Sequence, residues 1–210
     1  MTAPAARAET SASSPAPAAL RVVSDQRVDL PAAERAVTDL LRALGRDPSA
    51  PHLRDTPRRV ASAFAEMLTA EQFALTTFPN DEGYDELVLA RAIPFTSLCE
   101  HHLLSFTGVA HVGYLPGDRI VGLSKLARVV RHFARDLQVQ ERLTKQVADY
   151  LQSTLNPKGV GVVLEAEHLC MSVRGVQAQG ARTVTSCLLG KLREDPRSRQ
   201  EFMTLTLPSH

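Results

Sequence analysis

The sequence predicts a mixed α+β fold with a largely antiparallel sheet, and three features of the residue pattern support this prediction. Apolar residues recur at helical spacing over residues 30–68 and again over residues 123–155. Between these stretches, residues 106–114 alternate between apolar and more polar side chains, which is typical of a strand. Strands and helices do not follow one another as regular βαβ units, so a doubly wound parallel sheet is not expected.

The bulk composition is that of one ordinary globular domain. The 210 residues are 44% hydrophobic, and 24 Lys and Arg oppose 23 Asp and Glu, which leaves a formal net charge of +1. This balance predicts no nucleic-acid partner and no membrane partner, and no apolar run approaches the roughly 18 residues that cross a bilayer. Three cysteines are few, and an odd number cannot all pair within one chain, so they do not indicate a disulfide framework. We therefore expect a reduced, cytoplasmic protein.

Residues 1–28 are predicted to form a disordered tail. Eight of the first twenty residues are Ala, and Pro4, Pro15 and Pro17 interrupt them. Such a segment cannot bury enough apolar surface to offset the entropy lost on ordering. An organelle transit peptide stays the alternative, because the segment is poor in acidic residues. The folded domain is then expected over residues 29–210.

Two amphipathic helices are expected at the start of that domain, within residues 29–80. Pro31 suits a first helical turn, and Gly45 suits the end of the same helix. Asp55 is a good N-cap for the second helix, and Pro57 suits the turn that follows. The apolar positions of the two helices are Val37, Leu40, Leu41 and Leu44, and then Val60, Phe64 and Leu68.

Residues 81–210 are expected to hold the sheet and its covering helices. Residues 116–118 form a turn after the alternating strand, and residues 160–173 and 182–190 are predicted as further strands. A short final helix is predicted to start at residues 195–196. The alternating strand presents Phe106, Ala110, Val112 and Tyr114, and the two central helices present Leu123, Leu126, Val130, Phe133 and Leu137, then Leu143, Val147, Leu151 and Leu155.

Residues 98–102, Leu-Cys-Glu-His-His, are the first segment with an evident chemistry. Cys99 and His102 have two residues between them, so one short loop presents two ligands to one ion. Zinc accepts thiolate and imidazole together. Packing of these residues in a buried turn is an equally good interpretation of the loop alone.

His168 and Cys170 favour a metal site over simple packing of the loop. Alternate residues of a strand share a face, so a strand over residues 160–173 would carry both at the end of an otherwise apolar face. Cys99, His102 and Cys170 together make three protein ligands, which leaves a fourth position for water, as in catalytic zinc sites. Taken singly, Cys170 is a small core residue and His168 a satisfied core histidine.

Two further groups of polar residues have both a functional and a plain interpretation. Lys125 and Arg128 share a helix face next to Ser124, where an anion could bind, although a solvated basic face explains them as well. Arg174 adds a cation just after Cys170. The chain contains no Gly-rich phosphate loop of the common kinds.

Gln140 and Glu141 open the predicted helix over residues 140–155. A first-turn glutamate is usually a partner of the helix dipole. The functional alternative is a carboxylate that accepts two N–H hydrogen bonds from the edge of a guanine.

Taken together, these motifs resemble those of the GTP cyclohydrolase I family, in the family's order and with its intervals. The matching segments are residues 55–60, 98–102, 122–125, 138–143, 168–170 and 174–175. The resemblance extends over about residues 30–206. It implies a tunnelling fold, in which an antiparallel sheet carries helices on one face, preceded by a helical N-terminal section. It also implies a homodecamer with active sites at subunit interfaces.

The resemblance implies a role for each matched residue. Cys99, His102 and Cys170 would hold Zn²⁺, and His101 and His168 would be the catalytic histidines. The implied substrate-binding residues are Glu141 and Gln140 for guanine, Ser124 for ribose, Lys125, Arg128 and Arg174 for the triphosphate, and Arg59 from a neighbouring subunit.

The implied reaction is the zinc-dependent conversion of GTP to 7,8-dihydroneopterin triphosphate and formate, the first step of tetrahydrofolate and pterin synthesis. His101 would protonate N7 while water attacks C8. Two alternatives remain: another tunnelling-fold enzyme acting on a purine or pterin, and a non-catalytic zinc-binding interaction protein. A structural zinc would want a fourth protein ligand, and Cys187, the only spare cysteine, lies in an apolar strand.

Overall fold

The computed structural model describes residues 28–206, and the predicted tail lies outside these residues except for Val28. The helices are α1 (Leu30–Ala43), α2 (Thr56–Leu68), α3 (Leu123–Ala134), α4 (Gln140–Leu155), α5 (Leu169–Ser172), α6 (Lys191–Glu194) and α7 (Pro196–Thr206). The strands are β1 (Thr77–Pro79), β2 (Val88–Cys99), β3 (Ser105–Leu115), β4 (Arg119–Val121), β5 (Leu137–Gln138), β6 (Gly159–His168) and β7 (Thr183–Gly190).

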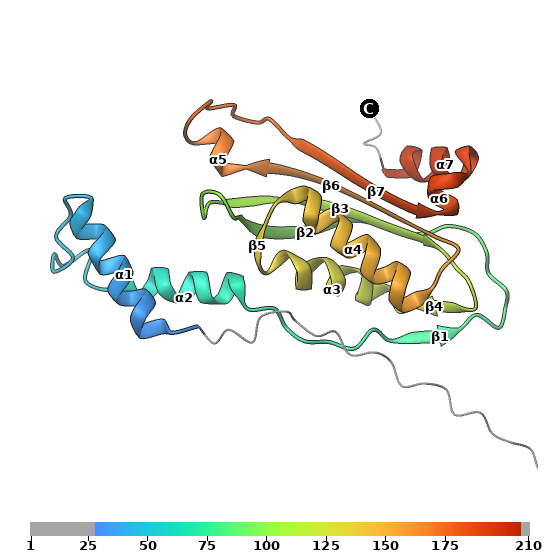
Figure 1. Cartoon of the computed structure of the whole chain (residues 1–210), viewed down its shortest axis with the longest axis horizontal. Helices are drawn as coiled ribbons and strands as arrows, with labels where there is room; N and C mark the ends of the chain where they lie inside the picture. Colours follow the sequence, from blue (N-terminus) through green and yellow to red (C-terminus); the bar gives the residue numbers. More distant parts are fainter. Residues whose placement is uncertain (1–27, 207–210) are drawn as a thin grey trace, which may run out of the picture.

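A five-stranded sheet in the order β5-β2-β3-β6-β7 forms the centre of the protein. Its four long strands are antiparallel neighbours, and the two-residue strand β5 pairs in parallel with the end of β2. A separate antiparallel pair joins β1 to β4. Figure 1 shows α3 and α4 side by side over one face of the sheet. This arrangement confirms the predicted α+β class, with a tunnelling-type sheet and an N-terminal helical section.

The main core lies between the sheet and helices α3 and α4. Alternate residues of β3 and β6 point into it, as the sequence pattern predicts, and α4 contributes its predicted stripe. Each buried Val, Leu or Phe side chain among them stabilises the fold by about 1.5–3 kcal/mol relative to exposure. The fully buried members from these elements are Phe106, Ala110, Val112, Val160, Val162, Leu164, Ala166, Leu143, Val147 and Leu151.

The second face of the sheet is partly covered by α7. Phe202 is fully buried there and packs with Val163 and Leu192. The ring fits because Gly161 has no side chain: a Cβ at that position would lie only 2.7 Å from a Phe202 ring carbon. The face opposite α3 and α4 therefore has a small core of its own.

Helices α1 and α2 form a hairpin that projects beside the sheet (Figure 1). Asp29 caps α1 by accepting a hydrogen bond from the Ala32 amide, and Gly45 follows the helix with a φ of +71°. No residue of α1 is buried, and Leu40 and Leu44 of its predicted apolar face are exposed. No helix among residues 28–206 combines the length and apolar character needed to cross a lipid bilayer.

Three details differ from the sequence prediction. The strand predicted over residues 160–173 ends at His168, where the chain turns into α5. Leu123 stands at the exposed start of α3, and Leu137 lies beyond the helix in β5, so neither belongs to the buried stripe, which Val129 completes. The predicted division of the domain at residue 80 stays a prediction.

We expect Phe202→Ala to lower the free energy of unfolding by about 3–5 kcal/mol, because removal of a fully buried ring leaves a cavity. Leu205→Ala on the same helix is the matched control, because Leu205 is exposed and its truncation should cost less than about 1 kcal/mol. Urea unfolding followed by circular dichroism measures both changes. Equal losses would contradict the packing of α7 on the sheet.

Candidate metal centre

Three side chains that could bind a metal ion meet at one end of the sheet. Cys99 is the last residue of β2, His102 lies in the turn that follows, and Cys170 lies in α5. The ligand atoms of these three residues all lie within 4.8 Å of one another. The sulfur of Cys99 is 3.6 Å from Nδ1 of His102. The sequence prediction that these residues form one group is therefore consistent with the geometry.

The turn between β2 and β3 brings Cys99 and His102 together. The amide of Leu103 donates to the Cys99 carbonyl at 2.9 Å, and the amide of Cys99 donates to the Leu104 carbonyl at 2.9 Å. Leu103 adopts a φ of +55°, which is uncommon for a bulky residue. The strained backbone marks this turn as one whose shape is held by its surroundings.

Cys170 reaches the group by a different route from the one that strand alternation predicts. β6 ends at His168, and residues 169–172 form one helical turn, in which the Ser172 hydroxyl bonds the His168 carbonyl. Cys170 therefore projects from a helical turn toward Cys99. The prediction that Cys170 lies on a strand is wrong, but its side chain still lies next to Cys99 and His102.

The electrostatics of the group suit a bound cation. Burial raises the pKa of the Cys170 thiol, the nearby Cys99 sulfur raises it further, and Arg174 acts in the opposite direction. Two thiols this close ionise together only when positive charge offsets their repulsion. Two sulfurs and an imidazole nitrogen are a donor set that zinc accepts, and no fourth ligand joins them among residues 28–206. The set therefore fits a metal ion with an open coordination position.

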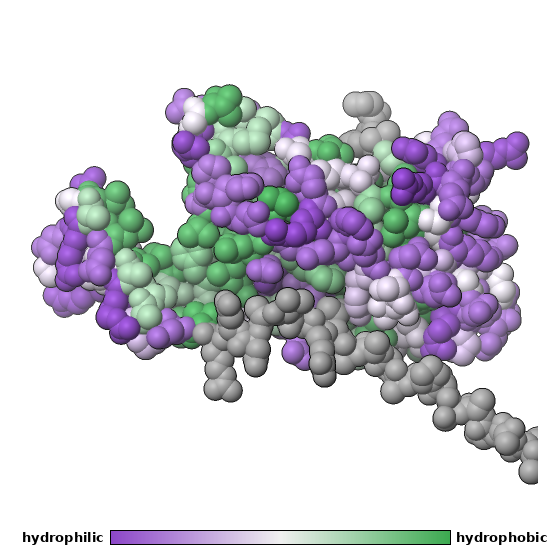
Figure 2. Space-filling model, viewed as in Figure 1, coloured by the Kyte–Doolittle hydropathy of each residue, from purple (hydrophilic) through white to green (hydrophobic). Residues whose placement is uncertain are grey.

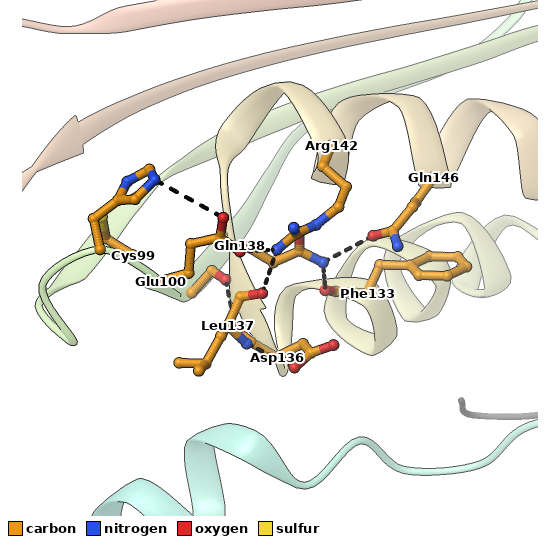
Figure 3. Close-up of polar contacts among 10 residues, drawn as sticks. Cys99, Glu100, Phe133, Asp136, Leu137, Gln138, Arg142 and Gln146 are labelled. Atoms are coloured by element: carbon orange, nitrogen blue, oxygen red, sulfur yellow. Dashed lines mark hydrogen bonds and ion pairs between the residues drawn. The ribbon is translucent and has the colours of Figure 1, made fainter. Parts of the chain in front are cut away.

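A polar network holds the neighbouring loop in place, and the sequence analysis did not identify it (Figure 3). Arg142 donates to the Glu100 carboxylate, to the Leu137 carbonyl and to Oε1 of Gln138. Nε2 of Gln138, which is almost fully buried, donates to the carbonyl of Phe133 and to Gln146. The network ties the loop after Cys99 to β5 and to the start of α4.

His101 lies beside the three-residue group without joining it. Its Nδ1 is 3.8 Å from the Cys99 sulfur, and its Nε2 is 3.9 Å from the Glu100 carboxylate. The side chain is largely exposed, so a substrate can approach it. Arg174 reaches the same region, with Nη1 3.4 Å from Nε2 of His102.

His168 is held by two neighbours. Its ring stacks on Phe106 with centroids 4.5 Å apart and planes 5° from parallel. Its Nε2 is 2.7 Å from Oε1 of Gln140. Burial lowers the pKa of His168, and the charge of Glu141 opposes that shift. Glu141 itself is exposed at the start of α4.

The side chain of Gln140 is buried between α4 and the sheet, and the predicted guanine-binding role of this residue stays a prediction. The side chain is 2% exposed, and both its amide nitrogen and its amide oxygen have partners within the protein. With all its polar atoms paired inside the protein, the side chain of Gln140 is not free to contact a substrate. Gln140 instead contacts His168.

The predicted phosphate-binding residues of α3 lie away from the metal ligands. The end of α3 approaches β2, because the Ser97 hydroxyl bonds the Asp136 carbonyl, whereas Ser124 and Lys125 lie at the helix start beside β4 (Figure 1). A rise of 1.5 Å per residue separates the two helix ends by about 15 Å. Within one chain, the geometry therefore does not bring Ser124 and Lys125 to Cys99.

Arg128 lines a cavity of about 120 Å³ between α3 and the segment that follows α2. Its other lining residues are Glu71, Phe73, Arg131, His132 and Arg135. Arg59 lies on α2, where its exposed side chain pairs with Asp55 at 3.3 Å. The structure thus presents the predicted cations on several separate surfaces.

Comparison with known proteins gives a consistent result. A family model described as GTP cyclohydrolase I matches residues 33–207. The GTP cyclohydrolase 1 of Mycobacterium marinum is 53% identical over 184 residues, which is 85% of this chain and 91% of that protein. The GTP cyclohydrolase 1 of a Synechococcus species is 51% identical over 179 residues, 83% of this chain and 78% of that protein. That of Aquifex aeolicus is 49% identical over 178 residues, 85% of this chain and 97% of that protein.

We expect Cys170→Ala to lose most of the bound metal, because two remaining ligands hold a divalent ion far more weakly than three. Cys187→Ala is the matched control, since Cys187 is the third free cysteine and lies on β7 outside the group. Elemental analysis of the purified variants measures metal per chain. Equal metal content in the two variants would contradict the assignment of the ligands.

Proposed function

The chain belongs to the GTP cyclohydrolase I family, and from that premise we propose that it converts GTP to 7,8-dihydroneopterin triphosphate and formate with the help of Zn²⁺. The observation that carries the proposal is the convergence of Cys99, His102 and Cys170 in a chain about half identical to named GTP cyclohydrolases. The product would feed pterin and tetrahydrofolate synthesis. Three free cysteines support a reducing compartment, and we place the protein in the cytoplasm.

The ligand set supports a catalytic role for the metal. A bound zinc ion with an open position supplies Lewis acidity that activates water near neutral pH. His101 would donate a proton to N7 of guanine, which its exposed ring beside the metal ligands allows. His168 would exchange a further proton with the substrate. The first water would open the imidazole ring and leave C8 as a formyl group on nitrogen. A second water would hydrolyse that amide and release formate, and the rearranged ribose carbons would then close the new ring with loss of one water.

Glu141 would hold the guanine ring in place. Its exposed carboxylate at the start of α4 is close enough to His168 to influence that ring's pKa. A carboxylate can accept two N–H hydrogen bonds from the Watson–Crick edge of guanine, which orients C8 for attack. Arg174, beside His102, would meet a phosphate group.

A second copy of the chain would complete the site. Ser124, Lys125 and Arg128 are the proposed ribose and triphosphate ligands, yet α3 holds the first two at the end of the helix away from the metal ligands. Arg59 on the projecting α1–α2 hairpin would come from a neighbouring subunit. We therefore propose a homo-oligomer, and a decamer from the family resemblance.

The surface around the metal centre supports such an assembly. Large apolar side chains are exposed in the turn between β2 and β3 and in the segment after α5. Figure 2 shows apolar surface near α5, at the end of the sheet that carries the metal ligands. Apolar residues gathered in this way mark surfaces that another protein chain covers. These residues are Leu103, Val173 and Val176.

Turnover of GTP tests the proposed reaction. The purified protein should release formate from GTP and give a fluorescent pterin after oxidation, and a metal chelator should abolish both signals. Glu141→Ala should lower kcat/KM about 10- to 100-fold, because a hydrogen bond to a charged group is worth about 1.5–3 kcal/mol.

Glu201→Ala is the control for this experiment, because Glu201 lies on α7 at the opposite end of the sheet (Figure 1). Its turnover should match that of the unchanged protein. Formate release that survives complete metal removal would exclude the zinc mechanism. Unchanged kcat/KM in Glu141→Ala would exclude the guanine contact.

Mixed assemblies test whether two copies share one site. Lys125→Ala and Cys170→Ala chains should each be inactive alone. In randomly mixed oligomers, about a quarter of the shared sites would combine an intact metal centre with an intact lysine, so about a quarter of full activity should return. Mixing Cys99→Ala with Cys170→Ala chains is the control, because both lack the same centre. If neither mixture regains activity, the whole site lies in one chain.

A further inference from the structure

The buried amide of Gln140 has only one orientation that its surroundings allow. Its Nε2 lies 3.2 Å from the carbonyl oxygen of Leu164, 2.9 Å from that of Thr183 and 3.1 Å from the hydroxyl of Thr185. Carbonyl oxygens only accept hydrogen bonds, so the group that faces them must be the amide N–H₂. The opposite orientation would bury an amide oxygen against two carbonyl oxygens, with no hydrogen bond to offset their desolvation.

The neighbouring hydroxyls agree with this orientation. The Thr144 hydroxyl donates its hydrogen to the Gln140 carbonyl at 2.7 Å. Thr144 and Thr185 hydroxyls are 2.6 Å apart, and Thr185 must be the donor, because the Thr144 hydrogen is already used. The Thr185 oxygen is then left to accept from Gln140. Every hydrogen in this buried network has one consistent place.

The orientation of Gln140 decides which nitrogen of His168 carries hydrogen. With its N–H₂ turned toward β6 and β7, Gln140 presents Oε1 to Nε2 of His168 at 2.7 Å. An amide oxygen only accepts, so Nε2 must bear the hydrogen. This holds for the neutral ring and for the charged ring alike. In the neutral ring, Nδ1 is then the nitrogen with a free lone pair.

The second nitrogen of His168 stays available. No described residue hydrogen-bonds to Nδ1, and Nδ1 is not among the enclosed polar atoms that lack a partner. Stacking on the fully buried ring of Phe106 prevents the imidazole from tilting. Nδ1 is thus not fully enclosed and has no partner among the described residues, so in the neutral Nε2–H ring it is free to act as an acceptor.

We propose that Gln140 is a positioning residue that fixes His168 as the Nε2–H tautomer, so that Nδ1 accepts the proton or hydrogen bond of the substrate. The consequence for catalysis rests on the proposed role of His168 in the GTP reaction, whereas the tautomer itself does not. A residue that holds a functional histidine in one tautomer typically contributes 10- to 100-fold to activity, and a wrong tautomer can cost far more.

Nitrogen NMR of the assembled, metal-loaded protein reads the tautomer directly. Solid-state spectra of ¹⁵N-histidine-labelled protein contain only seven histidines, and His168→Asn identifies the signals of His168 by their loss. At a pH where the ring is neutral, we expect a protonated Nε2 and an unprotonated Nδ1. A protonated Nδ1 in the unchanged protein overturns the proposal without reference to any variant.

Two variants separate positioning from packing. Gln140→Met keeps the side-chain length and removes the amide, so the His168 signals should split into both tautomers and kcat should fall about 10- to 100-fold with KM nearly unchanged. Thr185→Val removes one of three acceptors while both carbonyls still orient the amide, so it should keep the single tautomer and kcat within about twofold.

Retention of the single Nε2–H tautomer in a folded Gln140→Met protein overturns the proposal. If the unchanged protein shows the Nε2–H tautomer but turns over no GTP, the proposed function fails and the assignment of the tautomer is supported. A Gln140→Met protein with both tautomers and undiminished turnover overturns the catalytic consequence.

Discussion

The end of β2 is the constraint on which the rest of the candidate site depends. Leu98 pairs with Ser105 of β3 on one side and with Leu137 of β5 on the other, and Cys99 pairs with Gln138. These pairings position three segments at once: the tight turn that carries His102, the end of α3 and the start of α4. Because β3 also pairs with β6 up to His168, the chain that leads to Cys170 is held in the same frame. A displacement of β2 would therefore separate Cys99 and His102 from Cys170.

Charge around this frame is arranged in two layers. The inner layer holds the sulfurs of Cys99 and Cys170, and burial together with the nearby Cys99 sulfur raises the pKa of the Cys170 thiol. The outer layer holds fixed partners such as Arg142 on Glu100, whose ion pair is partly shielded from solvent. The outer layer ties the loop after Cys99 to β5 and to the start of α4, and the inner layer provides the donor atoms that could hold a metal ion.

Sequence patterns predicted the parts of this structure that depend on local periodicity. The apolar alternation of β3 and β6 and the stripe of α4 follow from burial against one core, so periodicity is sufficient to find them. The single turn α5 is too short to leave a periodic pattern, which is why Cys170 was assigned to a strand. The family resemblance placed Gln140 together with Glu141 at the guanine. Successive helical residues differ by about 100° in direction, however, so the side chain of Gln140 turns into the sheet and that of Glu141 to solvent. Only the tertiary position of α4 decides which one is buried.

The rigidity of α3 supports the proposal that the site combines residues from more than one chain. Leu126, Val129 and Val130 are all fully buried against the sheet. Moving the helix start by about 15 Å toward Cys99 would expose these side chains at about 1.5–3 kcal/mol each, a total comparable with the whole stability of a typical domain. A loop could close over a ligand at small cost, but a packed helix cannot. The packed helix therefore keeps the cations at its start away from Cys99 of the same chain, which supports the proposal that they serve a metal centre of another copy. The apolar side chains exposed on the turn after Cys99 and after α5 would offer a surface on which such a copy could pack.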